Sequence, residues 1–288
     1  MTGRVVKGIG GFYYVNDGQQ TVMGKARGNL KRNKELIYVG DIVDYEIDAN
    51  NECIVNRVVE RKNYLTRPPV SNLEMLVVVF AAAGPDPNLP VIDKLIAACE
   101  AKNIDVAVCI SKKDKVGEAE LHRLIDTYAG VYPTVAVNGV TGEGIDELRR
   151  ITAARNVALA GPSGVGKSTI TNHLLEGADE VATGSISDKT QRGRHTTRHV
   201  EIFTLADGTN VYDTPGFTSL DMPEMDEADV KCLFPEMRER LGGCKYANCM
   251  HINEPECCVK AALEAGEINK SRYDSYLMMV EEVKKWHK

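Results

Sequence analysis

The chain has 288 residues, more than most single domains contain, which predicts two or three domains. Its formal net charge of -6 excludes a surface that is basic throughout, so any contact with nucleic acid must be local. The longest apolar run, 76–83, is too short to cross a membrane, and no charged and then apolar leader opens the sequence. We therefore expect a cytoplasmic protein without a membrane partner.

The first segment, 3–61, alternates short runs rich in Val, Ile and Tyr with turn signals such as Gly10-Gly11 and Gly40-Asp41. This pattern predicts a small all-β, five-stranded OB-like barrel, a fold that often binds nucleic acid. One presumed loop concentrates basic side chains, namely Lys25, Arg27, Lys31, Arg32 and Lys34. The loop is the candidate RNA contact, although an ordinary solvated face explains the same residues.

The middle of the chain reads as an α/β fold that begins after Arg67-Pro68-Pro69, where two prolines interrupt the strand pattern. Expected strands are 75–81, 106–111, 134–137 and 156–160, followed by a strand pair at 200–205 and 209–212. Expected helices are 90–102, 118–128 and 144–153, with another after Lys167. Strands that alternate with helices predict a mostly parallel sheet. We expect domains at 1–66, 67–220 and 221–288.

A phosphate-binding loop of the form G-x-x-x-x-G-K-[ST] follows the apolar run 156–160 and precedes a helical stretch. Its residues are Gly161, Pro162, Ser163, Gly164, Val165, Gly166, Lys167 and Ser168, and we add Thr169 to the predicted nucleotide site. Glycines let backbone N–H groups converge on phosphate oxygens. Lys167 is expected on the outer phosphates, and the Ser168 hydroxyl is expected to ligate Mg²⁺.

Two further segments complete the expected phosphate site. The first, Asp213-Thr214-Pro215-Gly216, ends a strand and would bring a carboxylate near Mg²⁺ and the Gly216 amide near the γ-phosphate. The second, 193–198, is polar and begins with glycine, as expected of a segment ordered by Mg²⁺ and γ-phosphate. Thr197 or Thr196 would complete the Mg²⁺ shell, and the sequence does not choose between them.

Ser111-Lys112-Lys113-Asp114 follows an expected strand and is a variant of the N-K-x-D guanine signature. The Asp114 carboxylate can accept the N1–H and N2–H donors of guanine together, whereas adenine offers no such pair. Ser111 stands where asparagine is usual, so a shorter hydroxyl must supply the hydrogen bonds of that amide. The loop 137–144 is a variant of the S-A-x-T-G-x-G loop that cradles the base.

The tail crowds five of the eight cysteines into 232–258. Within it, Cys244, Cys249, His251 and Cys257 supply three thiolates and one imidazole, which is enough for one tetrahedral structural Zn²⁺. Four protein ligands leave no position for a reacting water. Cys232 and Cys258 are interpreted as lying outside the ligand set. A disulfide with an idle histidine is the alternative, which a reducing compartment disfavours.

Base recognition precedes the phosphate loop here, the reverse of the order in ordinary small GTPases. Together with the barrel, Arg67-Pro68 and the cysteine-rich tail, this order resembles the circularly permuted ribosome small-subunit-dependent GTPase A family (RsgA), over essentially the whole chain. The resemblance implies a GTPase stimulated by the 30S subunit, which binds 16S rRNA in late maturation and hydrolyses GTP to GDP and phosphate. Because Phe217 replaces the usual glutamine, it also implies that His195 orients the attacking water.

The resemblance and the motifs agree on the fold class. We expect a circularly permuted α/β P-loop GTPase domain, an N-terminal OB-like barrel and a small, mainly helical zinc-binding domain. The expected protein is a monomer that does not bind DNA. Two other functions remain open at this point: a P-loop ATPase or kinase, and a nucleotide-responsive RNA-binding scaffold with little hydrolysis. Comparing GTP with ATP binding separates the first from a GTPase, and hydrolysis with and without 30S particles separates the second.

Overall fold

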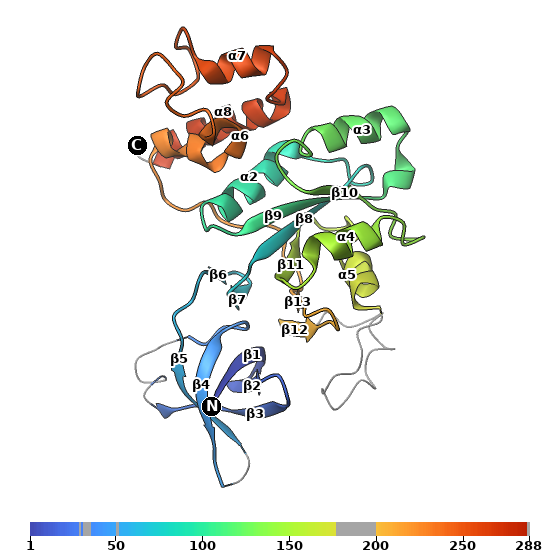
Figure 1. The fold of residues 1–288 in the computed structure, drawn as a ribbon, viewed down its shortest axis with the longest axis vertical. Coiled ribbons are helices and arrows are strands. Elements are labelled where there is room, and N and C mark those ends of the chain that lie inside the picture. The colour runs from blue at the N-terminus through green and yellow to red at the C-terminus, as the bar shows by residue number, and fades with distance from the viewer. Residues whose placement is uncertain (29, 31–35, 50–51, 177–199, 287–288) are drawn as a thin grey trace. The chain divides into compact units, whose positions relative to one another are not determined.

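A computed structural model describes residues 1–28, 30, 36–49, 52–176 and 200–286 (Figure 1). The chain divides into two compact units. Unit 1 contains Met1–Leu76, Thr152–Leu159 and Ser168–Phe217, and unit 2 contains Val77–Ile151, Ala160–Lys167 and Thr218–Lys288. Each unit therefore combines segments from different parts of the sequence. The three domain boundaries drawn from the sequence stay predictions.

Unit 1 begins with the expected barrel, built from strands β1 (Thr2–Ile9), β2 (Phe12–Asn16), β3 (Thr21–Ala26), β4 (Ile42–Ile47) and β5 (Cys53–Val58). Its strand order is β1-β2-β3-β5-β4, and pairing of β1 with β4 closes it. Val5, Val15 and Tyr45 fill its interior. Gly24 is required where β3 meets β5, because an added Cβ would lie 1.6 Å from the Cys53 carbonyl oxygen. The predicted five-stranded barrel is confirmed.

The same unit extends the sheet beyond the barrel. Strand β1 pairs with β12 (Glu201–Thr204), β12 pairs with β13 (Asn210–Asp213), and β13 runs parallel to β11 (Asn156–Ala160). The expected strand pair before and after residue 207 is thus confirmed as an antiparallel hairpin. Its continuation into the barrel was not predicted, because nothing in the periodicity of a strand identifies its neighbour.

A short hairpin, β6 (Tyr64–Thr66) and β7 (Pro69–Ser71), occupies the place where the sequence predicted only an interruption. Its turn contains a cis peptide bond between Arg67 and Pro68. Near this hairpin Asp41 is fully buried, and Arg61 Nε lies 2.7 Å and Ser71 Oγ 2.6 Å from its Oδ1. These bonds compensate the burial of the carboxylate and tie the hairpin to the barrel.

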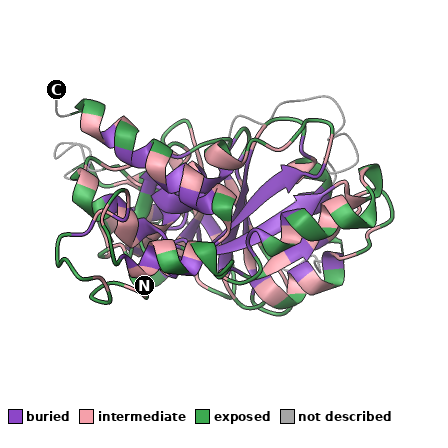
Figure 2. Cartoon of the chain, turned by 90° about the horizontal axis from the view of Figure 1, so that it is seen from above, coloured by how far each residue is buried: buried purple, intermediate pink, exposed green. Residues whose placement is uncertain are grey.

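Unit 2 holds the strands β8 (Met75–Ala81), β9 (Asp105–Ser111) and β10 (Thr134–Ala136), in the order β10-β9-β8. The first two residues of β8 belong to unit 1. Helices α2 (Leu89–Glu100), α3 (Glu118–Asp126) and α4 (Ile145–Thr152) follow these strands in turn, as the sequence predicted. Figure 2 shows strands buried along their length and helices buried on one side. This is the pattern of a sheet covered by amphipathic helices.

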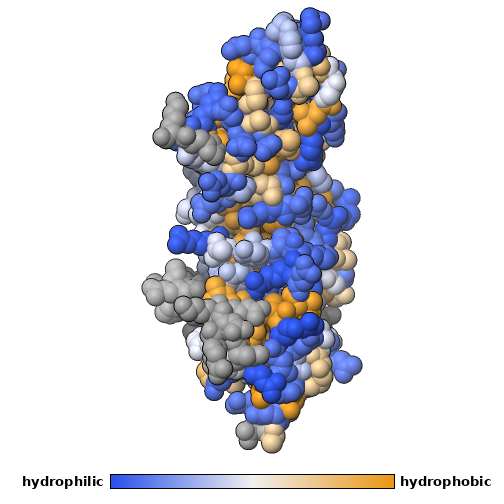
Figure 3. Space-filling model, turned by 90° about the vertical axis from the view of Figure 1, so that its left-hand side faces the viewer, coloured by the Kyte–Doolittle hydropathy of each residue, from blue (hydrophilic) through white to orange (hydrophobic). Residues whose placement is uncertain are grey.

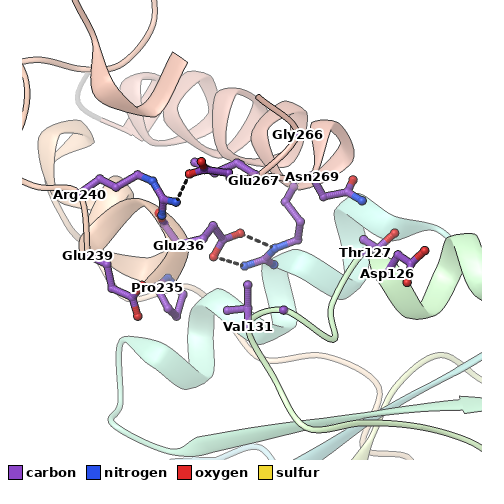
Figure 4. A pocket seen from close by; sticks show the side chains of 13 residues that line it. Asp126, Thr127, Val131, Pro235, Glu236, Glu239, Arg240, Gly266, Glu267 and Asn269 are labelled. Carbon is purple, nitrogen blue, oxygen red and sulfur yellow. Dashed lines mark hydrogen bonds and ion pairs between the residues drawn. The ribbon is translucent and has the colours of Figure 1, made fainter. Parts of the chain in front are cut away.

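The C-terminal part of unit 2 consists of the 3₁₀ helix η3 (Glu227–Leu233) and helices α6 (Pro235–Arg238), α7 (Cys258–Glu264) and α8 (Lys270–Trp286). Arg272 of α8 is buried and pairs at 2.8 Å with both Asp93 of α2 and Glu236 of α6. Figure 4 shows the ion pair of Arg240 with Glu267, and the Glu236 side chain near it, at an adjacent pocket of about 350 Å³. The predicted closing helix is confirmed.

Among the helices of the described residues, none is long and apolar enough to span a bilayer. Figure 3 shows one face of the molecule, where hydrophilic side chains are interspersed with small hydrophobic groups.

Candidate functional site

The phosphate loop connects the end of β11 to helix α5 (Lys167–Leu175), as the motif requires. Gly161 has a φ of +148°, and a Cβ there would lie 1.9 Å from the Val79 carbonyl oxygen. Gly164 and Gly166 also have positive φ, +78° and +95°. Val165 is buried and anchors the loop. The glycines are therefore needed for the path of the backbone, and the loop has the conformational freedom to wrap an anion.

Lys167 folds back over this loop. Its Nζ donates to the carbonyl oxygens of Gly161 and Pro162, at 2.7 and 2.8 Å. Burial lowers the pKa of Lys167. An approaching phosphate would raise this pKa, because its negative charge favours the ammonium form. Ser168 and Thr169 follow at the start of α5, and both are exposed. The cation and the hydroxyls thus stand at a helix N-terminus, where anions bind favourably.

Asp213 is the last residue of β13, which runs parallel to β11. Strands β11 and β13 are parallel with Ala158 opposite Tyr212, so Asp213 is level with Leu159, two residues before the loop begins. Gly216 has a φ of +70° and is exposed. Phe217 is only 2% exposed and packs inward, so it offers no polar group for positioning water.

Ser111 joins the base-recognition segment to the phosphate loop. Its hydroxyl lies 2.5 Å from the Val165 carbonyl oxygen and 3.2 Å from that of Phe80, and its single proton serves one of them at a time. The hydroxyl that replaces the usual asparagine amide thus bonds to the phosphate loop. The next residue, Lys112, has a φ of +54° and donates its Nζ to the Gly84 carbonyl.

The loop 138–144 is held against the same segment. Lys113 Nζ lies 2.6 Å from Glu143 Oε1, and Asn138 Oδ1 accepts the Val140 N–H at 2.9 Å. Gly144 has a φ of +88°, and a Cβ there would lie 2.4 Å from the Ala136 carbonyl oxygen. The structure therefore brings together both loops that the sequence assigned to the base, although they are separated by more than twenty residues.

Asp114 lies in the 3₁₀ turn η1 (Lys113–Lys115), where its side chain is 37% exposed. Lys115 Nζ lies 3.7 Å from its Oδ2. The carboxylate is thus accessible to a ligand. His195, Thr196 and Thr197 lie outside the described residues, as do Lys31, Arg32 and Lys34.

The four predicted metal ligands meet in one cluster. One ligand atom each from Cys244, Cys249, His251 and Cys257 lies within 4.8 Å of the others. The Sγ atoms of Cys244 and Cys257 are 4.0 Å apart, and His251 Nδ1 is 3.5 and 3.3 Å from them. Tetrahedral zinc requires about 3.8 Å between sulfurs and about 3.6 Å between sulfur and nitrogen, given its usual bond lengths. The residues fit Zn²⁺.

The protonation chemistry of the cluster also fits a metal ion. Burial lowers the pKa of His251, which keeps its imidazole neutral, as a ligand must be. Burial raises the pKa of Cys249 to about 12, against the smaller effect of the His251 N–H. A divalent cation supplies the positive charge that turns such thiols into thiolates.

Contacts outside the ligand set hold this loop. Tyr273 of α8 donates its hydroxyl to the His251 carbonyl at 2.6 Å, and Lys231 of η3 donates to the Cys249 carbonyl at 2.9 Å. Glu254 accepts the N–H groups of Met250, Ile252 and Asn253 at 2.7, 2.9 and 3.0 Å. The sequence analysis did not single out Glu254, whose only signal was an acidic residue between two ligands.

Cys258 lies closer to the cluster than the sequence analysis suggested. Its Sγ is 3.2 Å from the Cys244 Sγ and donates to the Arg240 carbonyl at 3.1 Å. The residue begins α7 directly after the ligand Cys257, which explains its position. Its thiol is therefore a neighbour of the ligands, bonded to the backbone.

Comparison with known proteins covers nearly the whole chain. The profile of the RsgA N-terminal domain matches residues 2–55, and that of the RsgA GTPase matches residues 58–223. The small ribosomal subunit biogenesis GTPase RsgA of Agathobacter rectalis is 42% identical, with 99% of this chain and 98% of the relative covered. The protein of the same name from Carboxydothermus hydrogenoformans is also 42% identical, with 98% of each covered.

Solved structures agree with these sequence matches. The crystal structure of YjeQ from Thermotoga maritima matches with a TM-score of 0.83 at 32% identity, over 98% of both chains. The structure of YloQ, a circularly permuted GTPase, matches with a TM-score of 0.80 at 30% identity, over 99% of this chain and 95% of that one. With the permuted order of its nucleotide loops, the barrel and the cysteine cluster all in place, the chain belongs to the RsgA GTPase family.

Proposed function

We propose that this protein hydrolyses GTP to GDP and phosphate and acts in the biogenesis of the small ribosomal subunit. The observation that carries the proposal is the contact between Ser111 and Val165, which fastens the guanine-reading segment to the phosphate loop. A phosphate loop alone is shared with ATPases and kinases. A phosphate loop joined to a segment that ends in Asp114 selects a guanine nucleotide.

The residues of the proposed phosphate site have separate binding roles. Backbone N–H groups of 161–166 and the Lys167 ammonium would hold the phosphate oxygens, while Ser168 and Asp213 would hold Mg²⁺. Mg²⁺ neutralises charge that develops on the phosphates when it is bound. The Gly216 amide would donate to the γ-phosphate. Thr197 or Thr196 completes the ion's shell.

Water must be positioned without the residue that follows Gly216, since Phe217 is buried and apolar. We assign this role to His195, whose imidazole can accept a proton or a hydrogen bond near neutral pH. Replacing His195 by alanine should lower stimulated turnover while GTP binding persists.

Recognition of guanine rests on Asp114. Its carboxylate accepts two N–H donors of guanine, and with adenine it would lose both bonds. A site built on such bonds rejects the wrong ligand by about 10⁴-fold or more. Lys112 and Lys113 support the segment from either side, through Gly84 and Glu143.

The cysteine cluster is proposed to hold one structural Zn²⁺. Cys244, Cys249, His251 and Cys257 would fill all four positions, so the ion organises the tail and takes no part in hydrolysis. The loop has few apolar side chains of its own, and metal binding supplies the free energy that orders it.

The partner we propose is the 30S subunit, through its 16S rRNA, in late maturation. The names of the relatives specify small ribosomal subunit biogenesis. RNA contact would come from the barrel, where Lys25 and Arg27 are exposed. Such binding depends strongly on salt. We further propose a cytoplasmic monomer that binds neither DNA nor membranes.

Hydrolysis measured with and without purified small subunits tests this function. We expect slow intrinsic turnover of GTP, little turnover of ATP, and a rise when the subunits are added. Lys167→Ala, which removes the phosphate-binding cation, should abolish both rates. Equal turnover of ATP would support an ATPase or kinase instead, and binding without hydrolysis would support an RNA-binding scaffold. Membership of a GTPase family favours neither alternative.

A further inference from the structure

Five neighbouring strands of unit 1 each place one residue in a single row. Across β3, β2, β1, β12 and β13, the paired residues are Met23, Tyr14, Lys7, Glu201 and Asp213. Directly opposed residues on adjacent strands point their side chains to the same face of a sheet. The row therefore runs from the barrel, through the strand that follows the segment 177–199, to the carboxylate expected beside Mg²⁺.

The barrel end of this row faces away from the barrel interior. Val15 of β2 is buried in the core, whereas its neighbour Tyr14 is partly exposed and lies outside that core. Met23 is 41% exposed. On the same face Lys25 Nζ lies 4.5 Å from the ring centroid of Phe12. Aromatic rings flanked by cations are suited to stacking the bases and binding the phosphates of single-stranded RNA.

Lys7 stands between the two ends of the row. Its Nζ lies 3.1 Å from Glu201 Oε2 and 5.9 Å from the ring centroid of Tyr14. Both partners of the ion pair are partly exposed, at 30% and 28%, so a phosphate group can reach the ammonium. Lys7 can bind the Glu201 carboxylate or an RNA phosphate, and binding one weakens its hold on the other.

Glu201 is the direct cross-strand neighbour of Asp213. Two carboxylates in such positions repel each other, and Lys7 offsets the charge of the first. Adjacent strands are about 5 Å apart, so Lys7 lies about 10 Å from the strand of Asp213. This distance is close to the screening length of about 8 Å at physiological salt, so the charge of Lys7 acts measurably at low salt and weakly at high salt.

We propose that the Lys7–Glu201 ion pair positions charge beside Asp213 and thereby couples RNA on the barrel to Mg²⁺ and GTP. The proposal rests on the proposed function. When an RNA phosphate binds the Lys7 ammonium in place of Glu201, the negative charge of Glu201 is no longer balanced. The electrostatic potential near Asp213 then becomes more negative and attracts Mg²⁺ more strongly. By linkage, Mg²⁺ with GTP must then strengthen RNA binding by the same factor.

The first test needs no RNA. The concentration of Mg²⁺ that half-saturates binding of a non-hydrolysable GTP analogue is measured at low ionic strength. Lys7→Gln, which leaves Glu201 unbalanced, should lower it by about fivefold or more, and Glu201→Gln should raise it by a similar factor, while Lys7→Arg keeps the value of the unaltered protein. If the ion pair were purely structural, Lys7→Gln and Glu201→Gln would change the half-saturating Mg²⁺ concentration in the same direction, or would leave it unchanged. Either result would overturn the proposal.

Arg57→Gln is the matched control, because it breaks an exposed barrel ion pair of 2.7 Å with Asp44, away from the row. It should leave the Mg²⁺ requirement unchanged. At high salt, the half-saturating Mg²⁺ concentrations of the Lys7 and Glu201 variants should approach that of the unaltered protein. Screening there removes the contribution of a charge about 10 Å away.

The second test measures RNA. Binding of a single-stranded RNA oligonucleotide is compared in GDP and in the GTP analogue with Mg²⁺, and we expect affinity at least about fivefold higher in the latter. Glu201→Gln, which leaves the RNA-facing residues intact, should still bind RNA but reduce this ratio to within about twofold. An undiminished ratio in Glu201→Gln would overturn the coupling. If the unaltered protein does not bind the RNA, the RNA part of the proposed function is refuted. The changes in half-saturating Mg²⁺ concentration would still decide the role of the ion pair.

Discussion

Single residues set the chemistry of the nucleotide site, and two of them do so in different ways. Asp114 is proposed to act through the acceptors that its exposed carboxylate presents to a ligand. Gly161 acts through what it lacks, because any Cβ would collide with the Val79 carbonyl. The first effect is on specificity and the second is on folding, so different measurements reveal them.

Asp114→Asn should reduce the affinity for GTP by about 100-fold or more, because two hydrogen bonds to a charged acceptor, each worth about 1.5 to 3 kcal/mol, are weakened or lost. The amide would instead donate to the C2 carbonyl of xanthine, so affinity for xanthosine triphosphate should rise. Calorimetry with both nucleotides checks this. Asp126→Asn, the same change at another exposed carboxylate of unit 2, should alter neither affinity.

Gly161→Ala should destabilise the protein by about 2 kcal/mol or more, because the added Cβ must displace backbone and the residue holds a positive φ. Thermal or denaturant unfolding measures the change. Gly117→Ala is the control, since an added Cβ there meets nothing within 4 Å and its φ is -74°. Comparable losses in the two variants would contradict the steric argument.

At the scale of elements, the loop that carries the predicted metal ligands contrasts with helix α8. The loop has backbone groups held by side chains, as with Glu254, and a residue with positive φ at His251, where φ is +58°. Helix α8 has a row of buried residues, including Tyr276 and Val280, that pack in the local core. We therefore expect the loop to depend on the proposed ion, whereas the helix is stabilised by burial.

Removal of the metal should affect these elements unequally. We expect one Zn²⁺ per chain, measured by atomic emission, and its removal by a chelator should increase hydrogen exchange in 244–257. Exchange in α8 should change much less, because its core contacts do not need the ion. Cys249→Ala should lose the ion, and Cys232→Ala should retain it. Retention of zinc by Cys249→Ala, or equal exchange in both elements, would contradict this account.

At the scale of the whole molecule, contacts between residues distant in sequence join the elements within each unit. In unit 2, Arg272 binds carboxylates on α2 and α6 and contacts the ring of Phe234, with 4.8 Å between its guanidinium carbon and the ring centroid. In unit 1, Arg4 donates to Asn156 at 2.9 Å and so links the barrel to β11. These contacts attach the barrel to β11 in unit 1 and helix α8 to α2 and α6 in unit 2.

Arg272→Met should destabilise unit 2 by about 3 to 5 kcal/mol, because Asp93 and Glu236 would remain buried without their common partner. Denaturant unfolding followed by fluorescence or circular dichroism measures the loss. Arg123→Met removes an exposed helix-surface pair with Glu120 and should change stability by less than about 0.5 kcal/mol. If Arg272→Met and Arg123→Met lowered the free energy of unfolding by equally small amounts, the buried ion pairs of Arg272 would not be what stabilises the packing of α8.

The sequence by itself determined the class of most segments, the order of the nucleotide motifs and the four residues of the cysteine and histidine cluster, because these depend on local periodicity, on glycine and proline, and on the spacing of chemical groups. The contact of Ser111 with Val165, the row from Tyr14 to Asp213 and the burial of Arg272 were decided only by the tertiary structure. Each joins segments that are far apart in the chain, and neither propensity nor spacing specifies which strand or helix becomes a neighbour. A serine hydroxyl or an arginine has the same local signature in solvent as in a core, and packing alone distinguishes the two.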